Sequence, residues 1–289
     1  MRFRLRSPDD FSASHSVVYH GAAMSRRRSL RETTTGTSTA TAEAAAEAFR
    51  RDGFVVMPGL FDRAEVRRIS AWTDELQALP ERPGHCMMYF ERSLLDPGQR
   101  VLQRIENFCP FHPGFASLCV GDKLSGTTAA LLGEPAVLFK DKINFKLPGG
   151  DGFKPHQDQQ AGWSTYADLF VTAMVSIDDT TAENGCLELA AGHHTRGLIG
   201  DEWKPLSEDD MRRMDARAVP TRAGDVVFFD SYTPHASGPN LTADRRRVLY
   251  ITYNRLSAGD HRARYFADKR KNFPPDIERE PGRTYTFRV

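Results

Sequence analysis

The chain has 289 residues, of which 40% are hydrophobic and 27% are charged, and its formal net charge is +1 at pH 7. This near-neutral charge gives no electrostatic case for binding nucleic acid, and no apolar run approaches the roughly 20 residues needed to cross a bilayer. The four cysteines form no CxxC pair, which argues against a disulfide scaffold and indicates a reduced, cytoplasmic protein.

The N-terminal segment differs from the rest of the chain in charge. Residues 1–31 contain seven arginines and two aspartates, and no apolar stretch of the kind found in export signals follows the Arg26–Arg28 run. Residues 33–41 form a low-complexity Thr/Ser/Gly/Ala stretch that is expected to be unstructured. We therefore expect a disordered basic leader over residues 1–40, with a start at Met24 left open, and a single domain over residues 41–289.

Helical patterns come first in the remaining chain. The segment AEAAAEAFRRDG predicts a short helix that ends at its glycine, and GFVVMPGL predicts a short strand closed by Pro-Gly. Asp62 and Glu65 are close to a capping box, and apolar residues at helical spacing continue from there until Pro80. Another helix is predicted over residues 122–132.

The pattern changes from residue 136 onward. Short segments rich in β-branched and aromatic residues are separated by Gly, Pro and Asn: AVLFKDKINFKL, DLFVTAMVSID, CLELA, DVVFFD and RRVLYITYN. Many short strands with this punctuation are typical of a sandwich or barrel rather than a parallel α/β sheet. We expect a mainly β fold with flanking helices, namely a double-stranded β-helix of the jelly-roll, cupin-like kind.

The segment PHQDQQAGW places His156 and Asp158 on either side of one glutamine. Residues i and i+2 of an extended strand share a face, so the two side chains can reach one metal ion. A set of two histidines and one carboxylate leaves three positions of an octahedral iron open. A third ligand is expected from a histidine downstream, and the candidates are His193, His194, His235 and His261.

Arg246 lies eleven residues after His235, inside the next predicted strand. A jelly roll places these two strands side by side, so Arg246 can point into the same cavity as His235. An arginine there would bind a carboxylate through two parallel hydrogen bonds. A metal triad with one buried arginine is what a 2-oxoglutarate-dependent iron oxygenase requires, because the keto acid chelates the metal and the arginine holds its far carboxylate.

Four segments, in this order, resemble the phytanoyl-CoA dioxygenase superfamily of Fe(II)/2-oxoglutarate oxygenases: FRRDGFVVMPGLFDRAEV, INFKLPGGDGFKPHQDQQAGW, ENGCLELAAGHH and PHASGPNLTADRRRVL. They cover most of the predicted domain. The resemblance implies an enzyme, a hydroxylase that uses Fe(II), 2-oxoglutarate and O2 to oxidise a C–H bond of a small polar molecule.

The resemblance also implies roles for individual residues. Arg246 matches the arginine that binds 2-oxoglutarate, although Arg245 and Arg247 leave the register open by one residue. Asn144, in the INFK segment, and Thr172, on the following strand, match further contacts to 2-oxoglutarate. The three positions that match the iron ligands are His156, Asp158 and His235.

The substrate pocket is expected close to the metal strand, and its candidate residues are Trp163, Tyr166, Asp141 and Lys142. The aromatic face of Trp163 either packs in the core or holds a cationic headgroup. The C-terminal run RTYTFRV ends with Arg288, which is either a solvated charge or part of a tail that clamps an anionic substrate.

The segment HQDQQAGW indicates which branch of the family the chain resembles, because it departs from the ectoine-hydroxylase pattern. It is more similar to the branch that hydroxylates small aminoalkylphosphonates and their trimethylammonium analogues. Related halogenases replace the carboxylate ligand with a small residue, so Asp158 favours hydroxylation. Two alternatives stay open: the same chemistry, including desaturation or cyclisation, on a natural-product intermediate, and a non-catalytic jelly-roll binding protein. No pattern indicates the oligomeric state.

Overall fold

The computed structural model describes the backbone of residues 36–285 and the side chains from residue 42 onward. Residues 1–35 of the expected leader, and Arg288, lie outside the described residues. Helix α1 (Gly36–Asp52) begins inside the stretch that was expected to be unstructured, so that expectation is wrong for residues 36–41. Five alanines at positions 42–48 favour helix and extend it upstream.

The remaining elements are short, as the spacing of turn residues predicts. The helices after α1 are α2 (Arg63–Gln77), α3 (Pro113–Val120), α4 (Thr127–Leu132), α5 (Glu208–Arg213) and α6 (Arg262–Asn272). The strands are β1 (Phe54–Met57), β2 (Met87–Arg92), β3 (Arg100–Glu106), β4 (Ala136–Lys146), β5 (Phe153–His156), β6 (Phe170–Ser176), β7 (Leu187–Leu189), β8 (Arg217–Val219), β9 (Val226–Asp230), β10 (His235–Ser237) and β11 (Arg246–Arg255).

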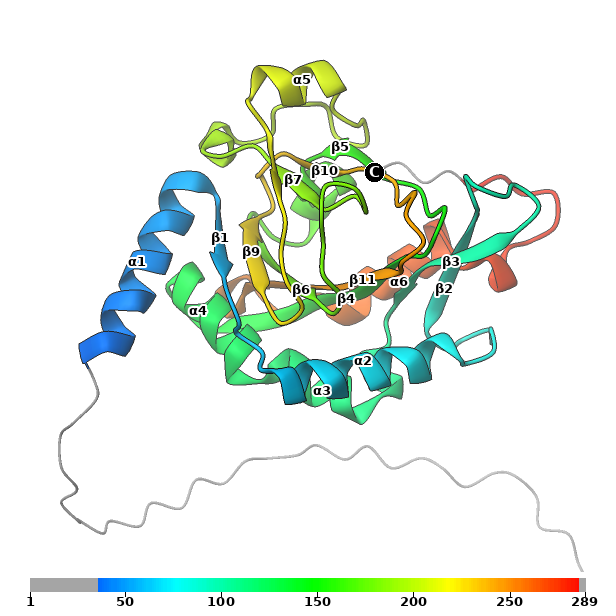
Figure 1. The fold of residues 1–289 in the computed structure, drawn as a ribbon, viewed down its shortest axis with the longest axis horizontal. Helices are drawn as coiled ribbons and strands as arrows, with labels where there is room; N and C mark the ends of the chain where they lie inside the picture. The colour runs from blue at the N-terminus through cyan, green and yellow to red at the C-terminus, as the bar shows by residue number, and fades with distance from the viewer. Residues whose placement is uncertain (1–35, 286–289) are drawn as a thin grey trace, which may run out of the picture.

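The strands form two antiparallel sheets that face each other. The larger sheet has the order β1-β9-β6-β11-β4-β3-β2, and the smaller has the order β5-β10-β7-β8. Figure 1 shows α2 and α3 on one side of the large sheet and β5, β7 and β10 on its other side. The predicted jelly roll with flanking helices is therefore confirmed.

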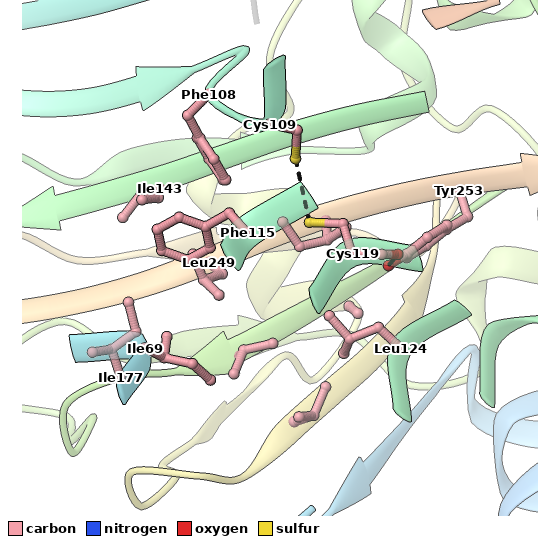
Figure 2. Packing of buried hydrophobic residues seen from close by; sticks show 14 of the residues in the cluster. Ile69, Phe108, Cys109, Phe115, Cys119, Leu124, Ile143, Ile177, Leu249 and Tyr253 are labelled. Carbon is pink, nitrogen blue, oxygen red and sulfur yellow. Dashed lines mark hydrogen bonds between the residues drawn. The ribbon is translucent and has the colours of Figure 1, made fainter. Parts of the chain in front are cut away.

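Helices α2, α3 and α4 cover the outer face of the large sheet. Asp62 caps α2 by accepting hydrogen bonds from the backbone of Ala64 and Glu65. The Glu65 carboxylate in turn accepts a hydrogen bond from the Asp62 backbone N–H, which completes the capping box that the sequence predicted. The core between these helices and the sheet contains aromatic and aliphatic side chains, and the sulfurs of Cys109 and Cys119 lie 3.5 Å apart within it (Figure 2).

Strand β4 shows how the sheet separates this core from the site. Ile143 and Phe145 point into the helix-covered core. Lys140, Lys142 and Asn144 alternate with them and line a cavity between the two sheets. No helix in the described part of the chain is long and apolar enough to span a membrane.

Candidate active site

Two strands of the small sheet bring two histidines together. His156 ends β5, His235 begins β10, and the two are direct cross-strand partners with ring centroids 4.3 Å apart. Asp158 is the first residue of a 3-10 turn (Asp158–Ala161), so the strand that was expected to carry both His156 and Asp158 already ends at His156. Gln157 is still extended, with φ −105° and ψ 136°, and this brings the carboxylate to the same side as the imidazole.

The three side chains present their ligand atoms to one point. An oxygen of Asp158, Oδ1, lies 3.8 Å from His156 Nε2 and 4.0 Å from His235 Nε2. All three ligand atoms lie within 4.8 Å of one another. The sequence prediction of which side chains converge is thus matched by the geometry, and His235 is the one of the four candidate histidines that joins the pair.

Backbone carbonyls fix the orientation of both imidazoles. His156 Nδ1 donates to the Lys154 carbonyl at 2.6 Å, and His235 Nδ1 donates to the Thr233 carbonyl at 2.9 Å. A proton held on Nδ1 leaves the lone pair of Nε2 free to bind a metal. Both Nε2 atoms face Asp158, so the tautomer that these bonds select is the one a metal site needs.

The pKa values of the triad point the same way. Burial lowers the pKa of His156 to about 3, and the neighbouring His235 adds to this effect. Burial also lowers the pKa of His235. For Asp158 burial alone raises the pKa, but the interactions with His235, His156 and the cavity lysines together outweigh burial and lower it. Two neutral imidazoles and one carboxylate are therefore present at neutral pH, and this is the protonation state in which such residues bind a metal.

Thr172 on β6 supports the carboxylate. Its hydroxyl donates to Asp158 Oδ2 at 3.2 Å and lies 2.9 Å from the hydroxyl of Thr252 on β11. The sequence reading gave Thr172 a contact to 2-oxoglutarate. That role stays a prediction. In the structure the hydroxyl contacts Asp158 and Thr252, and this position allows it to orient the Asp158 carboxylate.

Arg246 is fully buried at the start of β11 and shares a face with Tyr250 and Thr252. None of its three guanidinium nitrogens makes a hydrogen bond of good geometry with a described residue. The guanidinium is close enough to the Tyr250 hydroxyl to offset part of the rise that burial causes in the pKa of that group. Asn144, across the sheet on β4, likewise has a buried amide oxygen without a partner.

An unpaired buried guanidinium is costly unless a ligand binds it. Arg246 therefore fits the far carboxylate of a dicarboxylic acid whose other end reaches the triad. The neighbouring arginines do not compete for this role. Arg247 is engaged by Asp178 at 2.8 Å and by Asp74 at 2.7 Å, and the half-exposed Arg245 also pairs with Asp74.

The triad opens into a cavity of about 610 Å³, a size suited to small organic ligands. Three of the expected pocket residues, Lys142, Trp163 and Tyr166, line it. Trp163 is nonetheless only 3% exposed and packs against Phe139 and Phe170. Tyr166 donates a hydrogen bond to Asp268 on α6 at 2.8 Å.

The expectation for Asp141 is wrong. Its side chain faces away from the cavity, where it accepts hydrogen bonds from the backbone of Phe108 and Cys109 and pairs with Arg262. The reason is the alternation of β4, since Asp141 is one residue away from Lys142 and must point to the opposite face. Arg288 lies outside the described residues, while Arg283 of the same C-terminal run lines the cavity.

Sequence reasoning missed five charged cavity residues: Lys140, Arg104, Glu106, Asp268 and Lys269. Lys140 could have been predicted from the sequence, because it lies two residues before Lys142 and four before Asn144 on one strand and so shares their face. Arg104 and Glu106 come from β3 and Lys269 comes from α6. These segments carry no motif, and only tertiary packing brings them to the site.

Similarity to known proteins agrees with this geometry. Residues 49–248 match the family described as Phytanoyl-CoA dioxygenase (PhyH), the family that the sequence resemblance indicated. The chain is 43% identical over 239 residues to 2-aminoethylphosphonate dioxygenase of uncultured bacterium HF130_AEPn_1, covering 82% of this chain and 91% of that protein. It is 37% identical over 228 residues to methylphosphonate hydroxylase of Gimesia maris, covering 78% and 86%.

Solved structures share the architecture. The crystal structure of the non-heme alpha ketoglutarate dependent epimerase SnoN from nogalamycin biosynthesis superposes with a TM-score of 0.60 at 25% sequence identity, and the match covers 75% of this chain and 84% of that one.

Proposed function

Because the chain belongs to the phytanoyl-CoA dioxygenase family, and is therefore an Fe(II)/2-oxoglutarate-dependent dioxygenase, we propose that it hydroxylates a C–H bond of a small alkylphosphonate. Iron is its metal, and 2-oxoglutarate and O2 are its cosubstrates, as the sequence resemblance implied. The substrate class and the roles of individual residues are the proposed part.

The single observation that carries the proposal is the pairing of the triad with Arg246. The triad supplies two imidazole nitrogens and one carboxylate oxygen, the donor set that suits a non-heme Fe(II) with open positions. Arg246 supplies a buried cation that has no anionic partner among the described residues. A metal site alone is compatible with many functions, but a dicarboxylate that reaches from the metal to Arg246 satisfies both features at once.

When bound, iron and 2-oxoglutarate supply the oxidising chemistry, in which O2 is consumed and succinate and CO2 are formed. The protein supplies position and shielding. His156, Asp158 and His235 would hold the metal, Thr172 fixes the Asp158 carboxylate, and Arg246 would orient the cosubstrate. The cavity walls exclude water around the reacting C–H bond.

Two observations support a phosphonate as the substrate. Both curated relatives described above are named for phosphonates, one with an amino group and one without. The cavity walls also carry an excess of formal positive charge: five cations, Arg104, Lys140, Lys142, Lys269 and Arg283, face the carboxylates of Glu106, Asp268 and the triad residue Asp158. Such a cavity favours a small anion over an uncharged molecule, so it supports a phosphonate over any uncharged natural-product intermediate.

The test is a turnover screen with the purified iron-loaded enzyme. Methylphosphonate, 2-aminoethylphosphonate and 2-trimethylammonioethylphosphonate are each incubated with 2-oxoglutarate and O2, beside the carboxylate analogue β-alanine. We expect succinate formation to depend on a phosphonate and the product to gain one oxygen atom. A product that lacks two hydrogens instead would indicate desaturation, and succinate formation stimulated by none of the phosphonates would overturn the proposal.

A further inference from the structure

The cavity contains more positive charge than the metal and its cosubstrate require. Lys140 and Lys142 stand two residues apart on β4, and both line the cavity. Lys142 is close enough to the triad to lower the pKa of Asp158 and of His235. The two lysines therefore lie beside the place where a substrate must meet the metal.

A nearby trio of charged residues does not neutralise these lysines. Glu106 accepts a hydrogen bond from Arg104 Nε at 2.8 Å and pairs with Lys269 Nζ at 2.5 Å. Burial alone raises the pKa of Glu106, but Lys269 and the other cations around it outweigh burial and lower the pKa. Glu106 is therefore ionised, and Arg104 and Lys269 engage its two carboxylate oxygens.

Neither Lys140 nor Lys142 forms a direct ion pair with a carboxylate among the described residues, although Asp158 and Glu106 raise the pKa of Lys142 from a longer distance. Each ammonium instead lies against aromatic rings. Lys140 Nζ is 5.2 Å from the ring centroid of Trp163 and 5.7 Å from that of Tyr265. Lys142 Nζ is 4.5 Å from the centroid of Tyr250. Cation–π contacts orient an ammonium but do not provide a bound counter-ion.

The same contacts decide what Trp163 does. One reading of the sequence had its ring hold a cationic headgroup of the substrate. Lys140 already lies against this ring, and a substrate cation brought to the same place would meet a like charge. Trp163 and Tyr265 thus position a lysine of the protein, and the lysine faces the cavity.

We propose that Lys140 and Lys142 form the subsite that binds the phosphonate group of the substrate. This inference rests on the proposed function, which it deepens by naming the residues that select the anion. A phosphonate carries up to two negative charges on three oxygens, so it can accept from both ammonium groups at once, whereas a monoanionic ester is attracted less strongly. Burial lowers the pKa of Lys142 to about 7, and a bound anion offsets that cost.

The subsite also predicts which group of the substrate the two lysines bind. The two phosphonate enzymes similar to this chain are named for substrates that differ in the amine and share the phosphonate. If the lysines bind the shared group, their removal should weaken the binding of methylphosphonate and 2-aminoethylphosphonate by a similar factor. A lysine that acted on the amine end would affect only the second.

The experiment uses the iron-loaded enzyme with Lys140→Gln, Lys142→Gln and Lys142→Arg, and Lys271→Gln as the matched control. Lys271 is an exposed lysine on α6, outside the cavity lining. For each variant KM and kcat are measured with both phosphonates and with the monomethyl ester of 2-aminoethylphosphonate. The affinity for 2-oxoglutarate is measured separately by anaerobic titration, which also reports whether the site is folded.

We expect each glutamine variant to raise KM for both phosphonates by about 10- to 100-fold, in line with loss of a charge-assisted hydrogen bond. The ester should lose less, Lys142→Arg should recover part of the loss, and 2-oxoglutarate affinity should stay within about threefold. An unchanged KM in variants of an enzyme that does turn over phosphonates would overturn the subsite. So would a loss confined to 2-oxoglutarate. If wild type turns over no phosphonate, the proposed function itself fails.

Discussion

His156 and His235 are 79 positions apart in sequence and yet are direct partners across the β5–β10 pair, with ring centroids 4.3 Å apart. Their Nε2 atoms face the Asp158 carboxylate, and their Nδ1 atoms are held by backbone carbonyls. The site is therefore preorganised by strand register. We expect its properties to depend on groups that orient the ligands as well as on the ligands themselves.

The first prediction concerns pH. A metal competes with protons for the two Nε2 atoms, and burial lowers the pKa of both His156 and His235, the former to about 3. A lowered pKa means that the imidazoles stay neutral when the pH falls through 6.5, the ordinary histidine value. We expect the Co(II) affinity of the apoprotein, measured by calorimetry, to change less than about threefold between pH 7.5 and 6.0. Two histidines of ordinary pKa would instead lose more than about tenfold, and that result would count against the assigned protonation state.

The second prediction concerns 2-oxoglutarate. Arg246→Gln removes the buried guanidinium and should raise the KM for 2-oxoglutarate by about 100-fold or more, because a bidentate ion pair is lost. Metal affinity should be little changed, since Arg246 forms no hydrogen bond or ion pair with a residue of the triad. Arg245→Gln is the control, because that neighbouring side chain is half-exposed and pairs with Asp74. Equal losses in both variants would show that the register of the arginine is misassigned.

Thr172 offers a test of the carboxylate support. Thr172→Val keeps the shape of the side chain and removes its hydrogen bond to Asp158. We expect metal affinity to fall about tenfold while the KM for 2-oxoglutarate at saturating metal stays nearly constant. Thr128→Val is the matched control, because the Thr128 hydroxyl is buried on α4 without a hydrogen-bond partner among the described residues. The opposite pattern, with weak 2-oxoglutarate binding and normal metal binding, would support the contact between Thr172 and 2-oxoglutarate that the sequence predicted.

A Trp163 variant distinguishes two roles for this ring, namely positioning Lys140 and binding a cationic headgroup of the substrate. Trp163→Leu removes the ring beside Lys140, so the lysine loses its position. We expect KM to rise about three- to tenfold for methylphosphonate, 2-aminoethylphosphonate and the trimethylammonium analogue alike, in keeping with the strength of a cation–π contact. A loss confined to the trimethylammonium compound would mean that the ring binds the headgroup of the substrate after all.

The sequence predicted much of this architecture. The short strands with turn residues between them predicted the jelly roll. The spacing of the site residues, together with the family resemblance, predicted the triad and Arg246. The errors have local physical causes. Asp141 was placed in the pocket although its parity on β4 puts it opposite Lys142, and the Thr/Ser-rich stretch became helix because it adjoins an alanine-rich segment.

The residues that were missed show where sequence reasoning ends. Arg104, Glu106 and Lys269 form one charged cluster, but β3 and α6 are far apart in the chain and neither carries a motif. Their meeting depends on how α6 packs on the large sheet, and no local pattern encodes that. Lys140 is different, because its position on the cavity face follows from the alternation that also places Lys142 and Asn144 there.

The central claim is that His156, Asp158 and His235 hold iron for a 2-oxoglutarate-dependent oxidation. It is tested most directly by measuring phosphonate-dependent succinate formation in wild type and Asp158→Ala, with exposed Asp201→Ala as the control. An anaerobic titration with Fe(II) and 2-oxoglutarate accompanies it. The account predicts a metal-to-ligand charge-transfer band and succinate formation in wild type and the control, and loss of phosphonate-dependent turnover in Asp158→Ala. Succinate formation that persists in metal-free Asp158→Ala would contradict it.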